Sequence, residues 1–544
     1  MIRPRLWLVP ALALAMLGCE PAARVTIEQV NQELRLLEPQ EQMDFLRKRT
    51  PVDRVGDAAR LEGTDPVVLT WFSLVGGLDG TGTSEIPDLP TGTLGPDTDL
   101  RNELLKSLYR SDVPGSPAQI LSSLDTAPVT VSAIVPPLVQ VNQRLDVVVQ
   151  ALGRTRSLQG GVLMNTPLRQ TVTGRGGRTL YGETWAFAEG KVTLSHGRLA
   201  FGERAPTRET LGYAPAGGTS TVTGYLALAL RRADIYGAAL ITLSIDEQFP
   251  DAARVLNAQT IRISVPEYYR SEWERFAQVI AEIRCRPPRG RALRAHINDL
   301  AADLKGDDPA LAREAALKLE ALAPESVPAL EGALRSPRQD VRLLAACTLA
   351  AMREPAGITP LMHTIELGSE TDRRLAAHFL NFYTQHNVRD FQKKLLADAD
   401  PEIRYRALLG LEQTQEDAPY ATHQDARGED FKITQVQTAG SAALVVKARN
   451  PRRFVFFGPE LTLRPPFKQE HMKEILIEAQ DTSRLVIRYE VYGQSNTWPV
   501  PSMAAIELVR ALDHINLTSN DIMDLIFKLS RADAIAGEVV FLDE

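Results

Sequence analysis

Residues 129–169, VTVSAIVPPLVQVNQRLDVVVQALGRTRSLQGGVLMNTPLR, show an alternation of β-branched residues that is interrupted by proline and glycine. Such alternation predicts strands, here over 128–137 and 144–153, joined by a short connection that ends in proline. Leucines at helical spacing predict a helix over 100–110, and a helix over 251–256 and a strand over 259–266 are expected downstream. We therefore expect a domain of mixed α and β structure over 61–284.

A segment rich in Ala, Leu and Arg follows at 285–415. Within it, four similar stretches place an arginine before small or apolar residues and then leucine; the last three arginines are spaced by 31 residues, and the first precedes them by 29. The pattern resembles HEAT-like repeats, in which helix pairs stack because no pair buries its own apolar stripe. We expect an all-α solenoid of about four repeats, with an unrelated helical bundle as the alternative. The repeat positions are Arg313, Arg342, Arg373 and Arg404.

Alternation returns over 416–544. Strands are expected at 443–465 and 484–493, and a final pair of helices at about 502–529. The mixed α and β structure is thus expected on both sides of the repeats.

The first 18 residues combine two arginines with an apolar run that is shorter than the about 20 residues needed to span a bilayer. They predict a signal peptide, 1–18. Gly18 before Cys19 resembles a lipobox, so Cys19 is the expected lipid-attachment residue, and Glu20 resembles an outer-membrane address. An ordinary signal peptide with an incidental cysteine is the alternative. Residues 20–60 are expected to form a helical tether or spacer, or else a partner-binding helix.

Composition narrows the class of protein. The chain has 544 residues, 44% of them hydrophobic and 24% charged, with a formal net charge of -7. This is an ordinary soluble profile, and its acidic balance argues against nucleic acid as the principal partner. Beyond Cys19, only Cys285 and Cys347 remain, which is too few for a disulfide framework, and no Cys/His cluster has the spacing of a zinc site.

The chain lacks the sequence motifs of common catalytic sites. The P-loop, the GxGxxG order, HExxH and GxSxG are all absent. We therefore expect no enzyme activity, no catalytic residue, no cofactor and no metal site. A basic cluster at 284–294, RCRPPRGRALR, is interpreted as a solvated hinge or as a contact for anionic glycan or lipid.

A glycine-rich stretch, SLVGGLDGTG at 73–82, could cradle phosphate or form a turn with positive φ. It lacks the lysine of a P-loop, and it resembles a segment of the flagellar P-ring protein family. The blocks at 129–169, 249–266 and 504–542 resemble the same family, in the same order. Two features depart from the family: Trp71-Phe72-Ser73 replaces a Gly-Tyr-Gly pattern, and no cysteine follows Cys347 to form the C-terminal disulfide of enteric members.

The resemblance implies an α+β multidomain P-ring-like fold, in two parts over 61–284 and 416–544, interrupted by the HEAT-like solenoid at 285–415. It implies a structural, homo-oligomeric ring subunit in the periplasm, in the flagellar basal body, that contacts the flagellar rod and outer-membrane ring proteins. With the lipid anchor it would lie at the outer membrane, and the solenoid would project and bind another protein through its concave surface. A lipoprotein adaptor that reuses the fold is the alternative, followed by a cell-wall-acting enzyme.

Residues of the glycine-rich turn and of a second Gly-Gly pair are the candidates for subunit contact. Heterologous contacts close into a ring when the rotation between subunits permits. Asp79 is expected to cap local N–H groups. Fold maintenance and subunit contact are both open roles for this set, which consists of Gly77, Asp79, Gly80, Gly82, Gly160, Gly161, Pro167 and Arg169.

Overall fold

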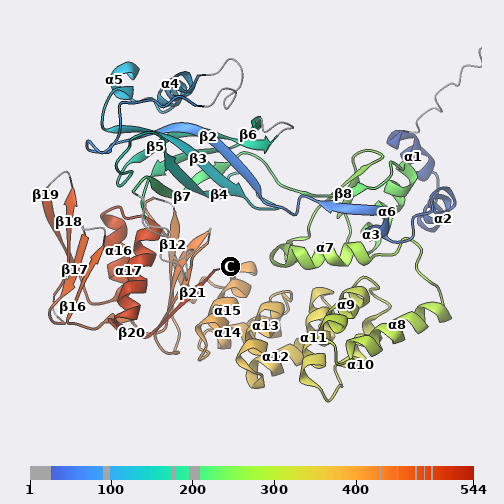
Figure 1. Cartoon of the computed structure of the whole chain (residues 1–544). Helices are drawn as coiled ribbons and strands as arrows, with labels where there is room; N and C mark the ends of the chain where they lie inside the picture. The colour runs from blue at the N-terminus through green and yellow to red at the C-terminus, as the bar shows by residue number, and fades with distance from the viewer. Residues whose placement is uncertain are drawn as a thin grey trace, which may run out of the picture.

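The computed structural model describes residues 26–89, 99–173, 179–194, 209–428, 430–449, 451–471, 475–482, 484–491 and 494–543. The signal-peptide and lipid-attachment predictions, 1–18 and Cys19, lie outside these residues. A barrel, a small α/β unit, a stack of helices and a C-terminal α+β part follow one another and form a closed circuit (Figure 1). No helix in the described ranges is both long and apolar enough to cross a membrane.

The barrel is closed and entirely antiparallel, with the strand order β2-β3-β4-β7-β6-β5. The strands expected at 128–137 and 144–153 are confirmed as β3 and β4, and the helix over 100–110 as α4 (Leu100–Arg110). Helix α4 packs beside an irregular part of the β2–β5 ladder, where Ser107 and Ser73 hydroxyl oxygens lie 3.0 Å apart. The strands are β2 (Val67–Gly76), β3 (Thr126–Val135), β4 (Arg144–Ala151), β5 (Val162–Thr173), β6 (Thr179–Lys191) and β7 (Leu211–Ser220), with α5 (Pro117–Leu121) before β3.

The α/β unit is a small sheet covered by helices. Its strand order is β1-β8-β10-β9, and β10 confirms the strand expected at 259–266. The helix expected over 251–256 is wrong: the helix is α6, which ends at Gln248, and β9 follows because Pro250 and the positive φ of Asp251 (+59°) break the helix. The elements are α1 (Ile27–Leu34), α2 (Pro39–Arg49), α3 (Val55–Ala58), β1 (Ala59–Glu62), β8 (Leu226–Leu230), α6 (Ile235–Gln248), β9 (Ala253–Val255), β10 (Thr260–Ile263), η2 (Glu267–Glu272) and α7 (Trp273–Glu282).

The described part of the segment expected as a tether belongs to this unit. Val30 of α1 and Leu46 of α2 are fully buried in the same core as α6. This part of the chain is therefore built into the fold rather than suspended as a spacer.

Helices occupy the segment between 291 and 413, and neighbours in sequence pack together as pairs. Asp308 and Asp400 accept hydrogen bonds from backbone N–H groups at the start of α9 and α15, and each is followed by a proline at the first helical position. The helices are α8 (Arg291–Leu304), α9 (Pro309–Glu320), α10 (Val327–Ala333), α11 (Gln339–Ala351), η3 (Pro355–Gly357), α12 (Ile358–Leu367), α13 (Glu370–Leu380), α14 (His386–Leu395) and α15 (Pro401–Gln413).

The C-terminal part packs α16 and α17 between two sheets (Figure 1). The strand order is β11-β12-β14-β13-β21 in one sheet and β16-β17-β18-β19 in the other, with a small β15–β20 ladder. The predicted final pair of helices is confirmed. The elements are β11 (Ala421–Asp425), β12 (Phe431–Val436), β13 (Ala443–Lys447), β14 (Arg452–Phe457), β15 (Thr462–Leu463), β16 (Phe467–His471), β17 (Ile475–Ala479), β18 (Leu485–Val491), β19 (Gln494–Val500), α16 (Ala505–His514), α17 (Ser519–Arg531), β20 (Ile535–Ala536) and β21 (Glu538–Leu542).

The junctions between these parts differ in chemistry. One apolar core runs from α6 through the helices to β13 and β14. The barrel meets the C-terminal part through polar groups: buried Arg452 pairs with Asp146 at 2.6 Å, and the Thr193 hydroxyl donates to Asp521 at 2.7 Å. These contacts complete the circuit.

Candidate functional site

The glycine-rich turn lies at one end of the barrel, directly after β2. Its backbone is bonded to the segment before β3: Leu78 N–H donates to the carbonyl of Asp125 at 3.0 Å, and Gly82 N–H to that of Leu124 at 2.7 Å. The Thr81 hydroxyl donates to the carbonyl of Ser157 at 2.9 Å. We call residues 76–82, 123–126 and 157–162 the glycine-turn end.

Two of the predicted glycines are required by packing inside the molecule. A Cβ atom on Gly82 would lie 2.1 Å from the carbonyl oxygen of Thr126, and one on Gly161 would lie 2.4 Å from Cγ1 of Val75. Backbone and a β-branched side chain cannot yield by that much. These two glycines therefore allow three chain segments to approach one another within the fold.

Three other predicted glycines serve the backbone conformation instead. Gly77, Gly80 and Gly160 have φ of +74°, +79° and +73°, and a Cβ on any of them would meet open space. Here glycine satisfies positive φ, which other residues rarely adopt. The absence of packed neighbours leaves this surface open to a partner.

The expected capping role of Asp79 belongs to a different residue. Asp79 is exposed with φ of +46°, whereas the carboxylate of Asp125 accepts from Gly80 N–H at 2.9 Å and from the Ser123 hydroxyl at 3.2 Å. The prediction is corrected in this respect. Asp125 comes from the connection before β3, 45 residues later in the chain, so local spacing around the glycines gave no signal for it.

The structure separates Pro167 and Arg169 from the glycine-turn end. Pro167 is buried on β5 in register with Phe187, and the Arg169 guanidinium lies 4.4 Å from the centre of the Trp71 ring. Arg169 is eight residues beyond Gly161, or about 26 Å along an extended strand. The predicted set is thus a turn cluster plus two strand residues near α4.

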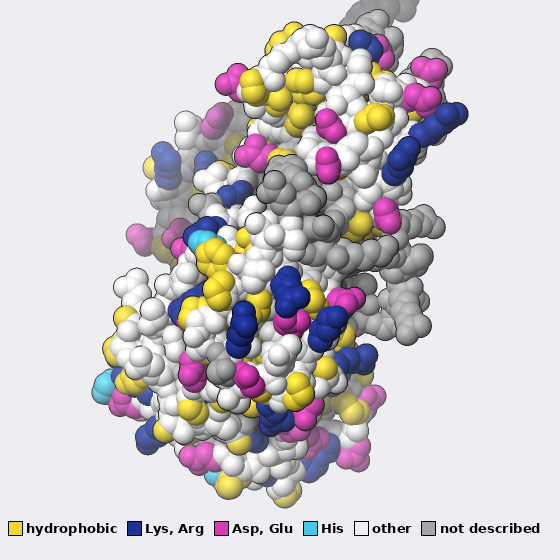
Figure 2. Space-filling view, turned by 90° about the vertical axis from the view of Figure 1, so that its left-hand side faces the viewer, with side chains coloured by type: hydrophobic (Ala, Val, Ile, Leu, Met, Phe, Trp, Pro, Cys, Tyr) yellow, Lys and Arg dark blue, Asp and Glu magenta, His cyan; other side chains and the backbone are white. Residues whose placement is uncertain are grey.

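Apolar side chains complete the glycine-turn end. Leu124 and Val162 are each 53% exposed, and Val162 pairs in register with Gly76. Figure 2 views the molecule from the side on which this end lies, and apolar side chains gather in the upper part of that face. Exposed apolar groups beside rigid turns are typical of contact surfaces. Sequence reasoning missed them because exposure is a tertiary property.

Three of the four repeat arginines bind backbone carbonyls at the end of the preceding helix or in the turn that follows it. Arg342 donates to the carbonyl of Ser336 at 2.8 Å, and Arg373 to that of Ile365 at 2.6 Å. Arg404 is fully buried, donates to the carbonyl of Asp398 and reaches Ser441 beside the C-terminal sheet; burial lowers its pKa. Carbonyls at a helix C-terminus attract a cation. Arg313 is exposed, so the first copy differs.

The protein's own chain covers one side of the helix stack. Arg275 of α7 donates to Glu320 of α9 at 2.9 Å, and Glu272 lies 2.8 Å from His378 of α13. Burial opposes ionisation of Glu272, but the hydrogen bond and charge of His378 lower its pKa overall. Elements η2 and α7 therefore lie along α9, α11 and α13, and the stack is fixed to the α/β unit instead of standing free.

One group of residues has ligand types that could hold a cation. The donor atoms of Glu412, Asp417 and His423 lie within 4.8 Å of one another. However, the Arg453 guanidinium donates to both Glu412 oxygens, and its Nη2 atom lies 3.1 Å from His423 Nδ1. Because Nδ1 accepts from Arg453, the ring proton is on Nε2 and faces Asp417 at 2.8 Å. The group thus forms an ion-pair network that joins α15 to the C-terminal sheet.

Together, these features define a mixed α and β protein whose candidate site is a surface of turns and apolar side chains. Residues 54–298 match the family model described as the flagellar P-ring protein, a range that begins at the N-cap of α3 and ends within α8. The α/β unit and the barrel therefore have the sequence characteristics of that family.

Curated proteins named flagellar P-ring protein are similar to the chain over about two fifths of its length. The one from Thiobacillus denitrificans is 30% identical over 225 residues, 39% of this chain and 57% of the relative. Those from Thermotoga petrophila and Geobacter metallireducens are 28% and 26% identical over 43% of this chain, and 67% and 62% of their own lengths. The chain thus spans between about half and two thirds of such relatives, and the resemblance to the family is confirmed. The likeness at 504–542 lies outside the family-model match and stays a prediction.

Proposed function

We propose that this protein is a structural, non-enzymatic subunit of a P-ring-like ring around the flagellar rod in the periplasm. The observation that carries the proposal is the family match, because it coincides with two folded parts, the α/β unit and the barrel, rather than with a short motif. The proposed assembly is a homo-oligomer that also contacts the rod and outer-membrane ring proteins.

The proposed subunit contact uses the glycine-turn end. Gly82 and Gly161 shape it from within, while Gly77, Asp79, Gly80 and Gly160 form its open surface. A ring requires one subunit to present a surface that differs from the surface it receives. A rigid turn flanked by exposed apolar residues suits this requirement because little order is lost on contact.

The proposed division of the chain gives the helix stack a role of its own. The proposed P-ring-like body consists of two parts, residues 61–284 and 416–544. The segment between them, residues 285–415, is proposed to be an inserted HEAT-like solenoid. Because η2 and α7 cover α9, α11 and α13, the proposed partner-binding face is the opposite layer, formed by α10, α12 and α14. Lipidation at Cys19 would hold the assembly at the outer membrane.

Electron microscopy of basal bodies tests the ring proposal. Basal bodies would be purified from the parent strain and from a deletion strain, with swimming scored in both. We expect loss of a periplasmic ring together with loss of swimming, and restoration of both by the full-length gene. Intact rings and normal swimming would reject the ring function and favour an adaptor lipoprotein.

A variant pair tests the contact surface separately. Asp79→Lys reverses the charge on the open turn without touching a buried group, so the fold should be retained while rings fail to form. Glu33→Lys on α1, far from the barrel, serves as the matched control. Normal rings with Asp79→Lys would reject the proposed contact and leave the ring function intact.

A further inference from the structure

A small polar pocket lies where the α/β unit meets the first pair of helices. Its volume is about 100 Å³, which is room for about three water molecules. Its walls come from the N-cap of α3, the end of α7 and the residues after it, α8, and α9 with the turn that follows it. The lining residues are Arg54, Glu282, Arg284, His296, Lys318 and Leu322.

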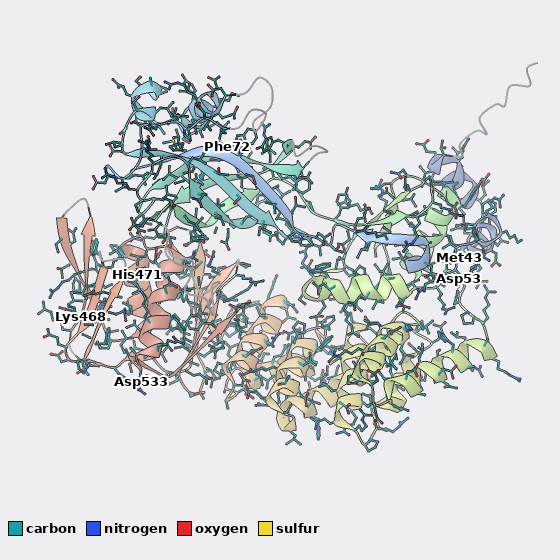
Figure 3. The ribbon with its side chains drawn as sticks, viewed as in Figure 1. Met43, Asp53, Phe72, Lys468, His471 and Asp533 are labelled. Atoms are coloured by element: carbon teal, nitrogen blue, oxygen red, sulfur yellow. The ribbon has the colours of Figure 1, made fainter. Side chains whose placement is uncertain are left out.

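The charges of the lining are mainly positive. Arg54 is already satisfied, because it pairs with Glu282 at 3.0 Å and with Asp57 at 2.7 Å. The Arg284 guanidinium makes no hydrogen bond with any described residue, and its nearest carboxylate, Asp53, is 3.8 Å away. That distance is too long for a hydrogen bond. Figure 3 shows Asp53 at the side of the α/β unit that faces the helices.

Lys318 is the second available cation. Its ammonium group pairs at 2.5 Å with Glu314, whose side chain is 56% exposed. An exposed pair one turn apart on a helix contributes little stability, so a ligand can replace the carboxylate at small cost. Among the acids near the pocket, Glu282 is paired with Arg54, whereas Asp53, Asp57 and Glu314 are more than half exposed and screened by water.

His296 lies against the same cations. Burial lowers the pKa of this imidazole, and the charges of Arg284 and Lys318 lower it further, opposed by Asp299. A bound anion would reverse the effect of the two cations and favour the protonated ring, which then becomes an additional hydrogen-bond donor.

We propose that this pocket binds a phosphate-sized oxyanion, held by the Arg284 guanidinium, the Lys318 ammonium and the His296 ring. The planar guanidinium can donate two parallel hydrogen bonds to such an anion. Free phosphate and a lipid headgroup both carry this group, and the test below separates the two sources. Lys318 lies beyond the family-matched residues and Arg54 and Arg284 within them, so the anion would fix the inserted helices to the α/β unit.

A histidine NMR titration tests the proposal on the full-length mature chain. Inorganic phosphate would be added at constant ionic strength to protein labelled with ¹³C in histidine, with His296 assigned by His296→Asn. We expect a saturable shift of the His296 signal and an upward shift of its pKa. Arg284→Gln and Lys318→Met should each weaken binding at least about tenfold, since each removes a charge-assisted contact.

Arg289→Gln is the matched control, because Arg289 belongs to the same basic cluster but is 77% exposed and pairs loosely with Asp44 at 3.8 Å. It should bind phosphate like the parent protein. A response in the parent protein that does not saturate, or equal weakening in the control, would overturn the proposal. If circular dichroism shows that Arg284→Gln is unfolded, Lys318→Met is the variant that tests the loss of binding.

Vesicles separate the two sources of the phosphate group. Phosphatidylglycerol vesicles that bind the parent protein and lose binding with Lys318→Met would identify a lipid headgroup. Saturable phosphate binding without vesicle binding would identify the free anion. Failure of both probes would overturn the proposal.

Discussion

Removing the charge of Glu320 should weaken the attachment of the helix stack to the α/β unit. The Glu320 side chain is 1% exposed, accepts from Arg275 Nε at 2.9 Å, and also accepts from the Tyr269 hydroxyl. Burial raises the pKa of Tyr269 well above its usual range, so this hydroxyl remains protonated and donates. In Glu320→Gln, the amide nitrogen must face one of these donors, and the buried Arg275 charge loses its counter-charge.

The expected loss is about 4 kcal/mol in the free energy of unfolding of the stack, because breaking one side of a buried ion pair typically costs 3–5 kcal/mol. Urea unfolding followed by circular dichroism at 222 nm reports mainly on these helices. Limited proteolysis should also cut the chain between 284 and 291 faster. The effect should change little with salt, since water does not screen a buried pair.

Glu314→Gln on the same helix is the control. It breaks an exposed pair with Lys318 and should cost no more than about 0.5 kcal/mol. A loss below about 1 kcal/mol in Glu320→Gln, or equal losses in the two variants, would show that the buried network does not hold the stack in place.

Asp125→Ala should cost about 1 kcal/mol in thermal unfolding of the barrel because it removes the bond to Gly80 N–H, whereas Asp79→Asn, which keeps a residue type that tolerates positive φ, should cost almost nothing. The reverse order would contradict the geometry of the turn. Gly82→Ala should destabilise the barrel by about 3 kcal/mol or prevent its folding, measured by near-ultraviolet circular dichroism, and a native signal at unchanged stability would contradict the 2.1 Å approach. Burial raises the pKa of Cys285 to about 11 and that of Cys347 to about 12, so both side chains remain thiols at pH 8. Both should react with an alkylating reagent only after urea is added, because the thiolate is the reactive form and the folded protein covers both sulfur atoms. Rapid labelling of the native protein would argue against their burial.

Elements with a strong period were predictable from the sequence. Alternation located β3 and β4, leucine spacing located α4 to the residue, and Asp-Pro marked the starts of α9 and α15. Helix α6 was missed because its sequence, IYGAALITLSIDEQ, is apolar on nearly every side and buried, so it shows no helical period.

The candidate site was only partly predictable. Positive φ at Gly77 and Gly80 follows from residue type, but the partner of the turn, Asp125, follows only from the fold. Likewise, the repeat spacing identified Arg342, Arg373 and Arg404, yet gave no indication that η2 and α7 lie across the stack. Contacts between distant segments have no signature in the local spacing of either segment.

The closed circuit of contacts gives the helix stack a mechanical character. A flexible arm would meet the rest of the molecule at one end, but this stack is joined to the α/β unit through Arg275 and to the C-terminal sheet through Arg404. The barrel is joined in turn to the C-terminal part through Arg452. A force applied to the barrel is therefore transmitted along two paths, one through the α/β unit and one through the C-terminal part. The helix stack joins the ends of these two paths and so keeps the α/β unit and the C-terminal part at a fixed separation.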